Sequence, residues 1–220
     1  MARAAPESWF ADRRDAGRRL AGQLRSYAGR RDVVVLGLPR GGVPVAYEVA
    51  VALRLPLDVI TVRKLGVPGR EELAFGAIAA GGVRVINAEV VTEAELTPDQ
   101  IERLVAEQQA ELERQERLYR GGVGPLALDR TTAIIVDDGL ATGATMRAAI
   151  DSARRHRAAH VVVAVPVAAA SSARALAADA DAIYCTVTPP RFLAVGNWYD
   201  DFSPTSDAEV HELLASARAG

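Results

Sequence analysis

The sequence predicts an α/β fold in which helices cover both faces of a mainly parallel sheet, a doubly wound arrangement. Three observations predict it. The chain has 220 residues and is 50% hydrophobic, which is enough to bury one full core. Short continuous apolar runs, such as Thr132–Val136, have the pattern of strands that are buried on both faces. These runs alternate with longer segments of helical periodicity, and that alternation favours a parallel sheet.

The first part of the chain predicts a strand–helix–strand unit. An amphipathic helix over residues 11–28 precedes it. Val33–Leu38 is a continuous apolar run, which predicts a buried strand, and an apolar helix follows through Leu53. Leu57–Val62 is expected to be a second strand of the same sheet.

The middle of the chain interrupts this alternation with an insert. Leu73–Val90 predicts a β-hairpin, because Gly81-Gly82 separates two apolar stretches. Thr97 and Gln100 have the spacing of a capping box, which predicts the start of a long charged helix. The helix is expected to end at Gly121.

The last part returns to alternating strands and helices. Thr132–Val136 is expected to be a strand, followed by a helix to about Arg155. We expect a single domain over residues 1–220, with its core at about residues 30–188. The remaining expected elements are a strand over Val161–Val165, a helix over Ser171–Ala178, a strand over Ile183–Thr186, and a final helix capped by Ser206 or Asp207.

Composition excludes several classes of protein. The net charge is -2 and the pI is about 6.0, so no overall basic field favours nucleic acid or an anionic membrane. Cys185 is the only cysteine, which excludes a disulfide framework and a cysteine metal site and fits a reducing cytoplasm. The longest apolar stretch, Val161–Ala170, is too short to span a bilayer, and the N-terminus has no signal-peptide core. We therefore expect a cytoplasmic protein without nucleic-acid or membrane partners.

The most informative motif lies between Ile134 and Met146. An apolar run ends in Asp137 and Asp138, and a loop of small residues then opens onto a helix. Backbone N–H groups of such a loop, with the helix dipole, can hold a phosphate, while the carboxylates can bind a sugar diol or Mg²⁺. The loop is neither a Walker loop nor a dinucleotide-binding turn. The plain alternative is a capped strand–turn–helix, but two unpaired acids after a buried strand are costly.

A second glycine-rich motif, Leu38–Gly42, follows the first strand. The guanidinium of Arg40 can donate paired, charge-assisted hydrogen bonds to phosphate oxygens, and Gly41 and Gly42 allow the backbone to approach a ligand closely. A Gly-Gly turn into a helix would be the plain interpretation of this motif alone. Together, however, the two loops resemble those of the type I phosphoribosyltransferases, which bind 5-phosphoribosyl 1-pyrophosphate (PRPP).

The resemblance implies a role for each loop residue. Asp137 and Asp138 would hold the ribose hydroxyls and Mg²⁺, the implied cofactor. The pyrophosphate would lie against the loop of Arg40, Gly41 and Gly42 and against Lys64, which follows the second expected strand. The residues implied to bind the 5-phosphate are Ala141, Thr142, Gly143, Ala144 and Thr145.

Two further segments are similar to parts of the same family. The insert, at about residues 66–124, lies where family members keep a mobile loop. The tail at about residues 187–205 resembles the hood that covers the acceptor base, with Arg191, Phe192 and Asp200 as the residues implied to bind that base. Ala141 departs from the 6-oxopurine enzymes, which have an acid at this position, so the identity of the base stays open.

The resemblance implies a magnesium-dependent transferase. It would move the 5-phosphoribosyl group of PRPP to a ring nitrogen of a nucleobase or similar acceptor, release pyrophosphate and serve nucleotide salvage. Family members are usually dimers or larger homo-oligomers, so a homo-oligomer is expected here. Two alternatives remain open: a regulator that binds PRPP without transfer, and a hydrolase of sugar phosphates that uses the same loop.

Overall fold

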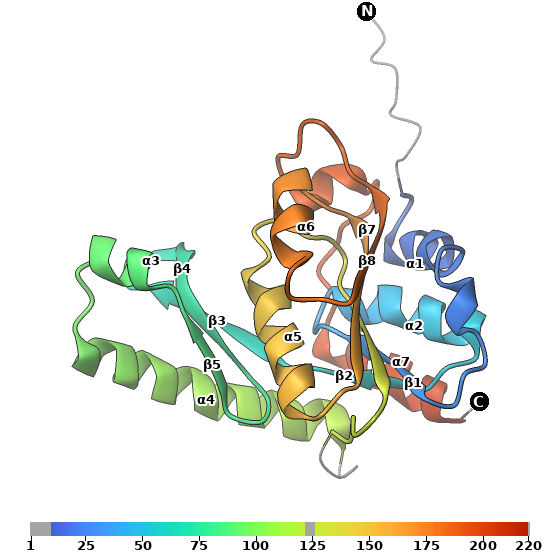
Figure 1. The fold of residues 1–220 in the computed structure, drawn as a ribbon, viewed down its shortest axis with the longest axis horizontal. Coiled ribbons are helices and arrows are strands. Elements are labelled where there is room, and N and C mark those ends of the chain that lie inside the picture. Colours follow the sequence, from blue (N-terminus) through green and yellow to red (C-terminus); the bar gives the residue numbers. More distant parts are fainter. Residues whose placement is uncertain (1–9, 122–125, 220) are drawn as a thin grey trace, which may run out of the picture.

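The computed structural model describes residues 10–121 and 126–219 and confirms the doubly wound α/β class (Figure 1). The core is one five-stranded sheet in the order β2-β1-β6-β7-β8, and every neighbouring pair of strands is parallel. The strands are β1 (Val33–Gly37), β2 (Leu57–Val59), β6 (Thr132–Val136), β7 (His160–Val167) and β8 (Ala182–Val187).

Helices pack on both faces of this sheet because alternate strand residues point to opposite sides. On β6, Ile134 and Val136 belong to one buried apolar cluster, whereas Ala133 and Ile135 belong to the other. The first face is covered by α1 (Arg13–Ala21), α2 (Gly42–Leu53) and α7 (Asp207–Ala219), and the second by α5 (Ala144–Arg155) and α6 (Ala170–Leu176). Ser206 caps α7, as expected, by accepting a hydrogen bond from the N–H of Glu209 at 3.1 Å.

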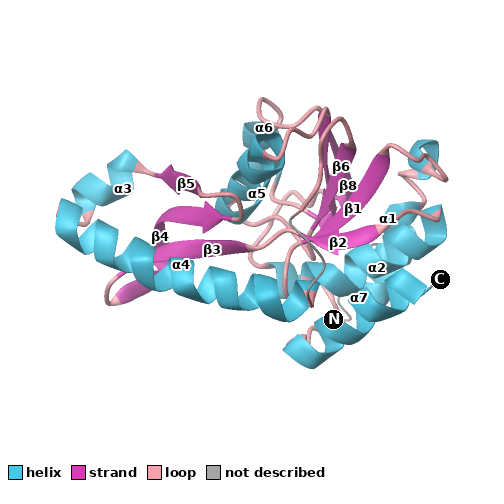
Figure 2. Ribbon diagram, turned by 90° about the horizontal axis from the view of Figure 1, so that it is seen from below, coloured by secondary structure: helices cyan, strands magenta, loops and turns pink. Residues whose placement is uncertain are grey.

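The insert forms an arm beside the core (Figures 1 and 2). The predicted hairpin is confirmed: β4 and β5 are antiparallel, with positive φ angles of 77° at Gly81 and 74° at Gly82. The capping box at Thr97 is confirmed too, and the helix ends at Gly121 in the left-handed conformation. The expected end of the insert, at about residue 124, lies outside the described residues. Its elements are β3 (Val62–Val67), β4 (Arg70–Ala79), β5 (Val83–Ile86), α3 (Ala88–Glu93) and α4 (Pro98–Arg120).

Two predicted elements were wrong in extent. Leu57–Val62 is not one strand: β2 ends at Val59, and β3 starts at Val62 and pairs with β4 instead of with the core. The apolar run continues across this break, so hydrophobicity alone could not show that the chain changes sheets. The helix expected over residues 11–28 ends at Ala21, and a separate 3₁₀ turn, η1, covers Arg25–Tyr27.

The hood segment, residues 187–205, packs against Phe10, the first described residue. Its short 3₁₀ helix η2 (Val195–Trp198) leads into Tyr199, which forms a parallel bridge with Phe10. Phe10 and Tyr199 are buried in an apolar cluster that Trp198 and Phe202 help to close. Phe10, just before α1, is therefore part of the wall around the hood.

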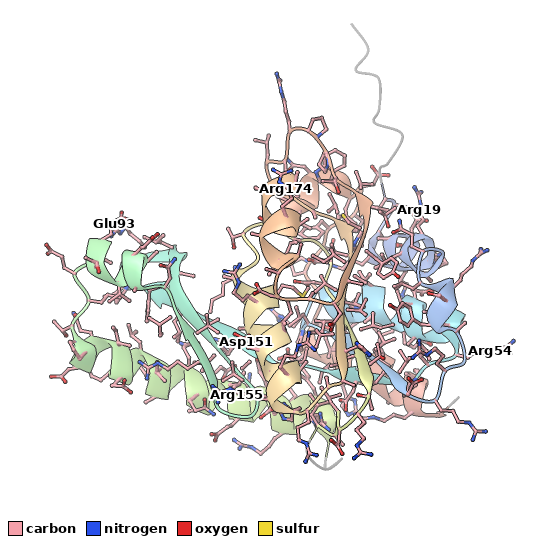
Figure 3. The ribbon with its side chains drawn as sticks, in the orientation of Figure 1. Arg19, Arg54, Glu93, Asp151, Arg155 and Arg174 are labelled. Carbon is pink, nitrogen blue, oxygen red and sulfur yellow. The ribbon has the colours of Figure 1, made fainter. Side chains whose placement is uncertain are left out.

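The outer surface is richly charged. Figure 3 places Glu93 on the arm and Arg54 at the opposite end of the molecule, and both side chains are exposed. Within residues 10–121 and 126–219, no helix has both the length and the apolar character that crossing a membrane requires.

Candidate active site

The two sequence motifs meet at the carboxyl edge of the sheet, between β1 and β6. Gly37 at the end of β1 pairs with Val136 at the end of β6, so both following loops leave the sheet at the same level. The N–H of Leu38 donates to the carbonyl of Val136 at 2.9 Å and holds the loops together. The chain crosses from β1 to β2 on one side, while β6 and the later strands lie on the other. This is the switch point at which doubly wound folds bind ligands.

The acidic pair is partly buried at this edge. The N–H of Asp138 donates to Oδ1 of Asp137 at 2.9 Å. Burial raises the pKa of Asp137 well above its ordinary value, and the charge of Asp138 raises it further, against the lowering effect of Lys64 and Arg13. Burial also raises the pKa of Asp138, which the guanidinium of Arg13 opposes. Such a pair is poised to accept a cation or hydroxyl donors.

Because the pKa of Asp137 is raised on folding, its ionisation costs stability. This loss of folding free energy is absent at pH values below the ordinary pKa of an aspartate. It grows as the pH rises from that value to the raised pKa of Asp137, and it is constant at higher pH. We therefore expect Asp137→Asn to raise the melting temperature by a few degrees at pH 7, where about 1 kcal/mol corresponds to roughly 2–4 °C. Thermal unfolding between pH 4 and pH 8 would show a gain that shrinks at the acid end. A variant that is less stable than wild type at pH 7 would contradict the prediction.

The loop after the acids forms a cradle at the start of α5. Gly143 has a φ of 83° and is the N-cap of this helix, with no side chain capping it. The amides of the first helical turn are therefore left for an external acceptor. The cradle and the acids line one cavity of about 200 Å³. Its lining comprises Lys64, Asp137, Asp138, Gly139, Leu140, Ala141, Thr142, Gly143, Thr145, Met146 and Val195.

The glycine-rich loop packs directly on the acids. A Cβ atom on Gly41 would lie 2.1 Å from Oδ2 of Asp138, and one on Gly42 would lie 2.8 Å from the Cα of Asp137. Both positions therefore require glycine for close approach. The peptide bond between Pro39 and Arg40 is cis. The guanidinium of Arg40 does not line the cavity; its Nη1 lies 4.0 Å from Oδ1 of Asp207 on α7.

Lys64 reaches the cavity from the insert. It lies within β3, not at the end of a core strand as the sequence indicated, and it is exposed. Its neighbour Arg63 points to the other side of the sheet, where Nε and Nη2 donate to Oε1 of Gln108 on α4 at 3.1 and 2.8 Å. The alternation along β3 thus brings Lys64, and not Arg63, to the acids.

The predicted acceptor residues are not gathered in this cavity. Val195, which would lie 2.5 Å from a Cβ on Gly139, is the hood residue that lines it. Arg191 and Asp200 are exposed outside the lining, and Phe192 packs against the cluster of Phe10 and Tyr199. The roles of Arg191, Phe192 and Asp200 in binding the acceptor stay predictions, since this cavity holds the acids and the cradle but not these three residues.

Sequence reasoning missed two residues that contact the acidic pair. Arg13 on α1 donates from Nε to Oδ2 of Asp138 at 2.9 Å. The hydroxyl of Tyr199 donates to the backbone carbonyl of Asp138 at 2.5 Å, and burial raises the pKa of this tyrosine, so it stays a donor. A helix of many arginines gave no signal that would single out Arg13.

Comparison with known proteins places the chain in a family. Residues 11–192 match the model of the phosphoribosyl transferase domain. A protein of Mycobacterium tuberculosis strain H37Rv, whose name assigns it provisionally to the phosphoribosyl transferases, is 50% identical over 208 residues. That alignment covers 94% of this chain but 47% of the relative, so the chain spans about half the length of the mycobacterial protein.

Two solved structures have a similar fold. The crystal structure of TT1426 from Thermus thermophilus has a TM-score of 0.79 and 40% identity, over 94% of this chain and 98% of that one. A protein of Aquifex aeolicus, AQ2163, is similar in fold alone, with a TM-score of 0.51 and 11% identity over 84% of this chain and 78% of that one. The family match extends over most of the chain and includes both loops at the switch point of the sheet. The chain therefore belongs to the phosphoribosyl transferase family.

Proposed function

We propose that this chain transfers the 5-phosphoribosyl group of PRPP to a ring nitrogen of a nucleobase or similar acceptor and releases pyrophosphate. One observation carries the proposal: the acids Asp137 and Asp138, the small-residue cradle and Lys64 line a single cavity. A sugar phosphate needs this combination, with hydrogen-bond acceptors for the ribose diol, amides for the 5-phosphate and a cation for the leaving group.

In the proposed reaction the protein mainly positions and neutralises charge. Asp137 and Asp138 hold the ribose hydroxyls, while Thr142, Thr145 and the amides of the cradle hold the 5-phosphate. Lys64 faces the pyrophosphate, whose negative charge grows as its bond to the anomeric carbon breaks. A ring nitrogen of the acceptor then attacks that carbon. Closure of the arm and hood over the cavity would exclude water and limit hydrolysis.

The acidic pair also fits Mg²⁺. The donors are two carboxylates, one of which carries a strongly raised pKa because its buried charge is poorly compensated. No cluster of three or more histidine, cysteine, aspartate or glutamate residues suited to a metal occurs in the described part of the chain. Mg²⁺ binding through one or two carboxylates, with substrate phosphates and water as the other ligands, matches this arrangement. When bound, the ion would neutralise pyrophosphate charge.

We also propose a setting for the activity. The net charge of -2 and the single cysteine support a cytoplasmic protein without nucleic-acid or membrane partners. A homodimer or larger homo-oligomer is the expected assembly, which light scattering coupled to gel filtration would measure.

Two measurements test the proposed reaction. Calorimetric titration with PRPP, with and without Mg²⁺, measures binding, and a panel of purine and pyrimidine bases then measures pyrophosphate release. Release that requires one of the bases supports the transferase. Binding without release indicates a regulator, and release of phosphate or pyrophosphate without any base indicates a hydrolase.

Substitution of Lys64 tests the assignment of the leaving-group side. We expect Lys64→Met to lower kcat/KM for PRPP by about ten- to hundredfold, since a hydrogen bond to a charged group contributes roughly 1.5–3 kcal/mol. Arg63→Met is the matched control, because it removes a neighbouring cation that bonds Gln108 instead. The control should keep its kcat/KM within about twofold. Equal losses in both variants would show a general effect on β3 and would remove Lys64 from the proposed site.

A further inference from the structure

Arg13 links three segments that are distant in the sequence. Its Nε donates to Oδ2 of Asp138 at 2.9 Å, and its Nη1 donates to the carbonyl of Ser203 in the hood at 2.7 Å. The guanidinium carbon also lies 3.9 Å from the centroid of the Phe202 ring. Only 11% of the Arg13 side chain is exposed. One planar group thus bonds the acidic pair and the hood at once.

The backbone holds Arg13 in this position. Asp12 caps α1 by accepting from the N–H of Asp15 at 2.7 Å, which fixes the turn that carries Arg13. Next to it, the N–H of Phe10 donates to the carbonyl of Trp198 at 3.0 Å, and the N–H of Asp200 donates back to Phe10 at 2.9 Å. The start of α1 and the hood are therefore joined along their backbones.

The helix itself is seated firmly on its neighbour. A Cβ on Gly17 of α1 would lie 2.6 Å from the carbonyl of Val45 on α2, so these helices touch at their backbones. Since α2 follows the glycine-rich loop, α1 has a fixed position relative to the acids. The interaction of Arg13 with Asp138 is thus built on a rigid support, the backbone contact between α1 and α2.

Two groups hold Asp138, and both belong to or contact the same part of the hood. The hydroxyl of Tyr199 holds its backbone carbonyl, and Arg13, which is held by Phe202 and Ser203, fixes Oδ2 of its carboxylate. Asp138 nevertheless still lines the cavity with the cradle. The contacts that hold this acid therefore involve residues of the hood on both its backbone and its carboxylate side.

We propose that Arg13 is a positioning residue that couples docking of the hood to the orientation of Asp138. This inference rests on the proposed function, in which Asp138 holds the ribose of PRPP. By fixing Oδ2, Arg13 leaves the rest of the carboxylate to face the sugar, and it transmits a movement of residues 199–203 to that carboxylate. Binding of PRPP and docking of the hood then favour each other.

Arginine is required because three contacts must form together. Nε and Nη1 donate to different partners while the guanidinium carbon lies over the Phe202 ring. A lysine could pair with Asp138 through its single ammonium group. It could not at the same time donate to the carbonyl of Ser203 and lie over the Phe202 ring. Arg13→Lys should therefore keep part of the affinity for PRPP and lose the coupling to the hood, whereas Arg13→Gln should lose both.

The test combines ligand binding with a spectroscopic signal from the hood. Titration calorimetry with PRPP and Mg²⁺ gives the affinity, and the emission of Trp198, recorded in a Trp9→Phe background, reports hood docking without any ligand. We expect Arg13→Gln to weaken PRPP binding at least tenfold and to shift the emission of Trp198 to the red. Arg14→Gln is the matched control, because Arg14 is more exposed and pairs with Glu48 instead; its affinity and emission should match wild type.

Variants of Phe202 and Arg13 together complete the test. Phe202→Leu should weaken PRPP binding in the wild-type background but add little to Arg13→Gln, because both changes break the same link. Simple additivity of the two losses, or unchanged affinity and emission in Arg13→Gln and Arg13→Lys, would overturn the inference. If wild type itself fails to bind PRPP, the proposed function fails. The emission of the Arg13 variants then still decides whether this residue holds the hood.

Discussion

An Asp138→Asn variant should fold normally but use PRPP about ten- to hundredfold less efficiently, measured as kcat/KM from pyrophosphate release. The amide oxygen of asparagine can still accept the hydrogen bond from Arg13, so the contact with α1 is retained. The negative charge is lost, and with it a charge-assisted bond to the ribose diol that contributes roughly 1.5–3 kcal/mol. The loss should appear in PRPP binding, which calorimetry would measure separately from turnover.

A matched aspartate outside the site controls for the change of charge. Asp129 is exposed, and its partner Arg157 is exposed as well, so Asp129→Asn should keep kcat/KM within about twofold. Circular dichroism and thermal unfolding would confirm that both variants are folded. Turnover by Asp138→Asn at the wild-type rate would remove Asp138 from the proposed site, whatever the acceptor base is.

The parts of the fold that could be predicted are those whose hydrophobic pattern has clear ends. The strand Thr132–Val136 was placed to the residue, because an apolar run is bounded by Arg130 on one side and Asp137 on the other. The hairpin turn at Gly81-Gly82 also followed from the sequence, since both residues have positive φ. The change of sheet between Val59 and Val62 could not be seen, because it depends on pairing of β3 with β4.

The same distinction applies to the site. Both loops could be placed together from the sequence, because the carboxyl ends of parallel strands meet at one edge of a sheet. Arg13 could not, since 125 residues separate it from Asp138 and the contact forms only through tertiary packing of α1 against α2 and the hood. The interaction of Arg40 with Asp207 was missed for a similar reason: α7 reaches the loop through tertiary packing.

The Gly41→Ala substitution adds only one methyl group but should lower kcat/KM for PRPP strongly. The Cβ of Gly41→Ala would lie 2.1 Å from Oδ2 of Asp138 and 3.2 Å from Nε of Arg13, so the ion pair must move apart. Gly41 has a φ of -62°, a conformation that alanine adopts readily, so the backbone itself is not strained. We expect kcat/KM for PRPP to fall about 100-fold, as a displacement of about 1 Å at a reacting centre can cause.

Gly22→Ala and a double variant separate this effect from general destabilisation. Gly22 has a similar φ of -58°, but a Cβ added there would approach only the carbonyl of Arg19, at 3.2 Å. The kcat/KM of Gly22→Ala should therefore stay near that of wild type. In an Asp138→Ala background the carboxylate that meets the new methyl group is gone, and Gly41→Ala should then cost little further activity or stability. A full additional loss in that background would mean that the methyl group disturbs the glycine-rich loop itself. The requirement for glycine would then come from the ligand and not from the carboxylate of Asp138.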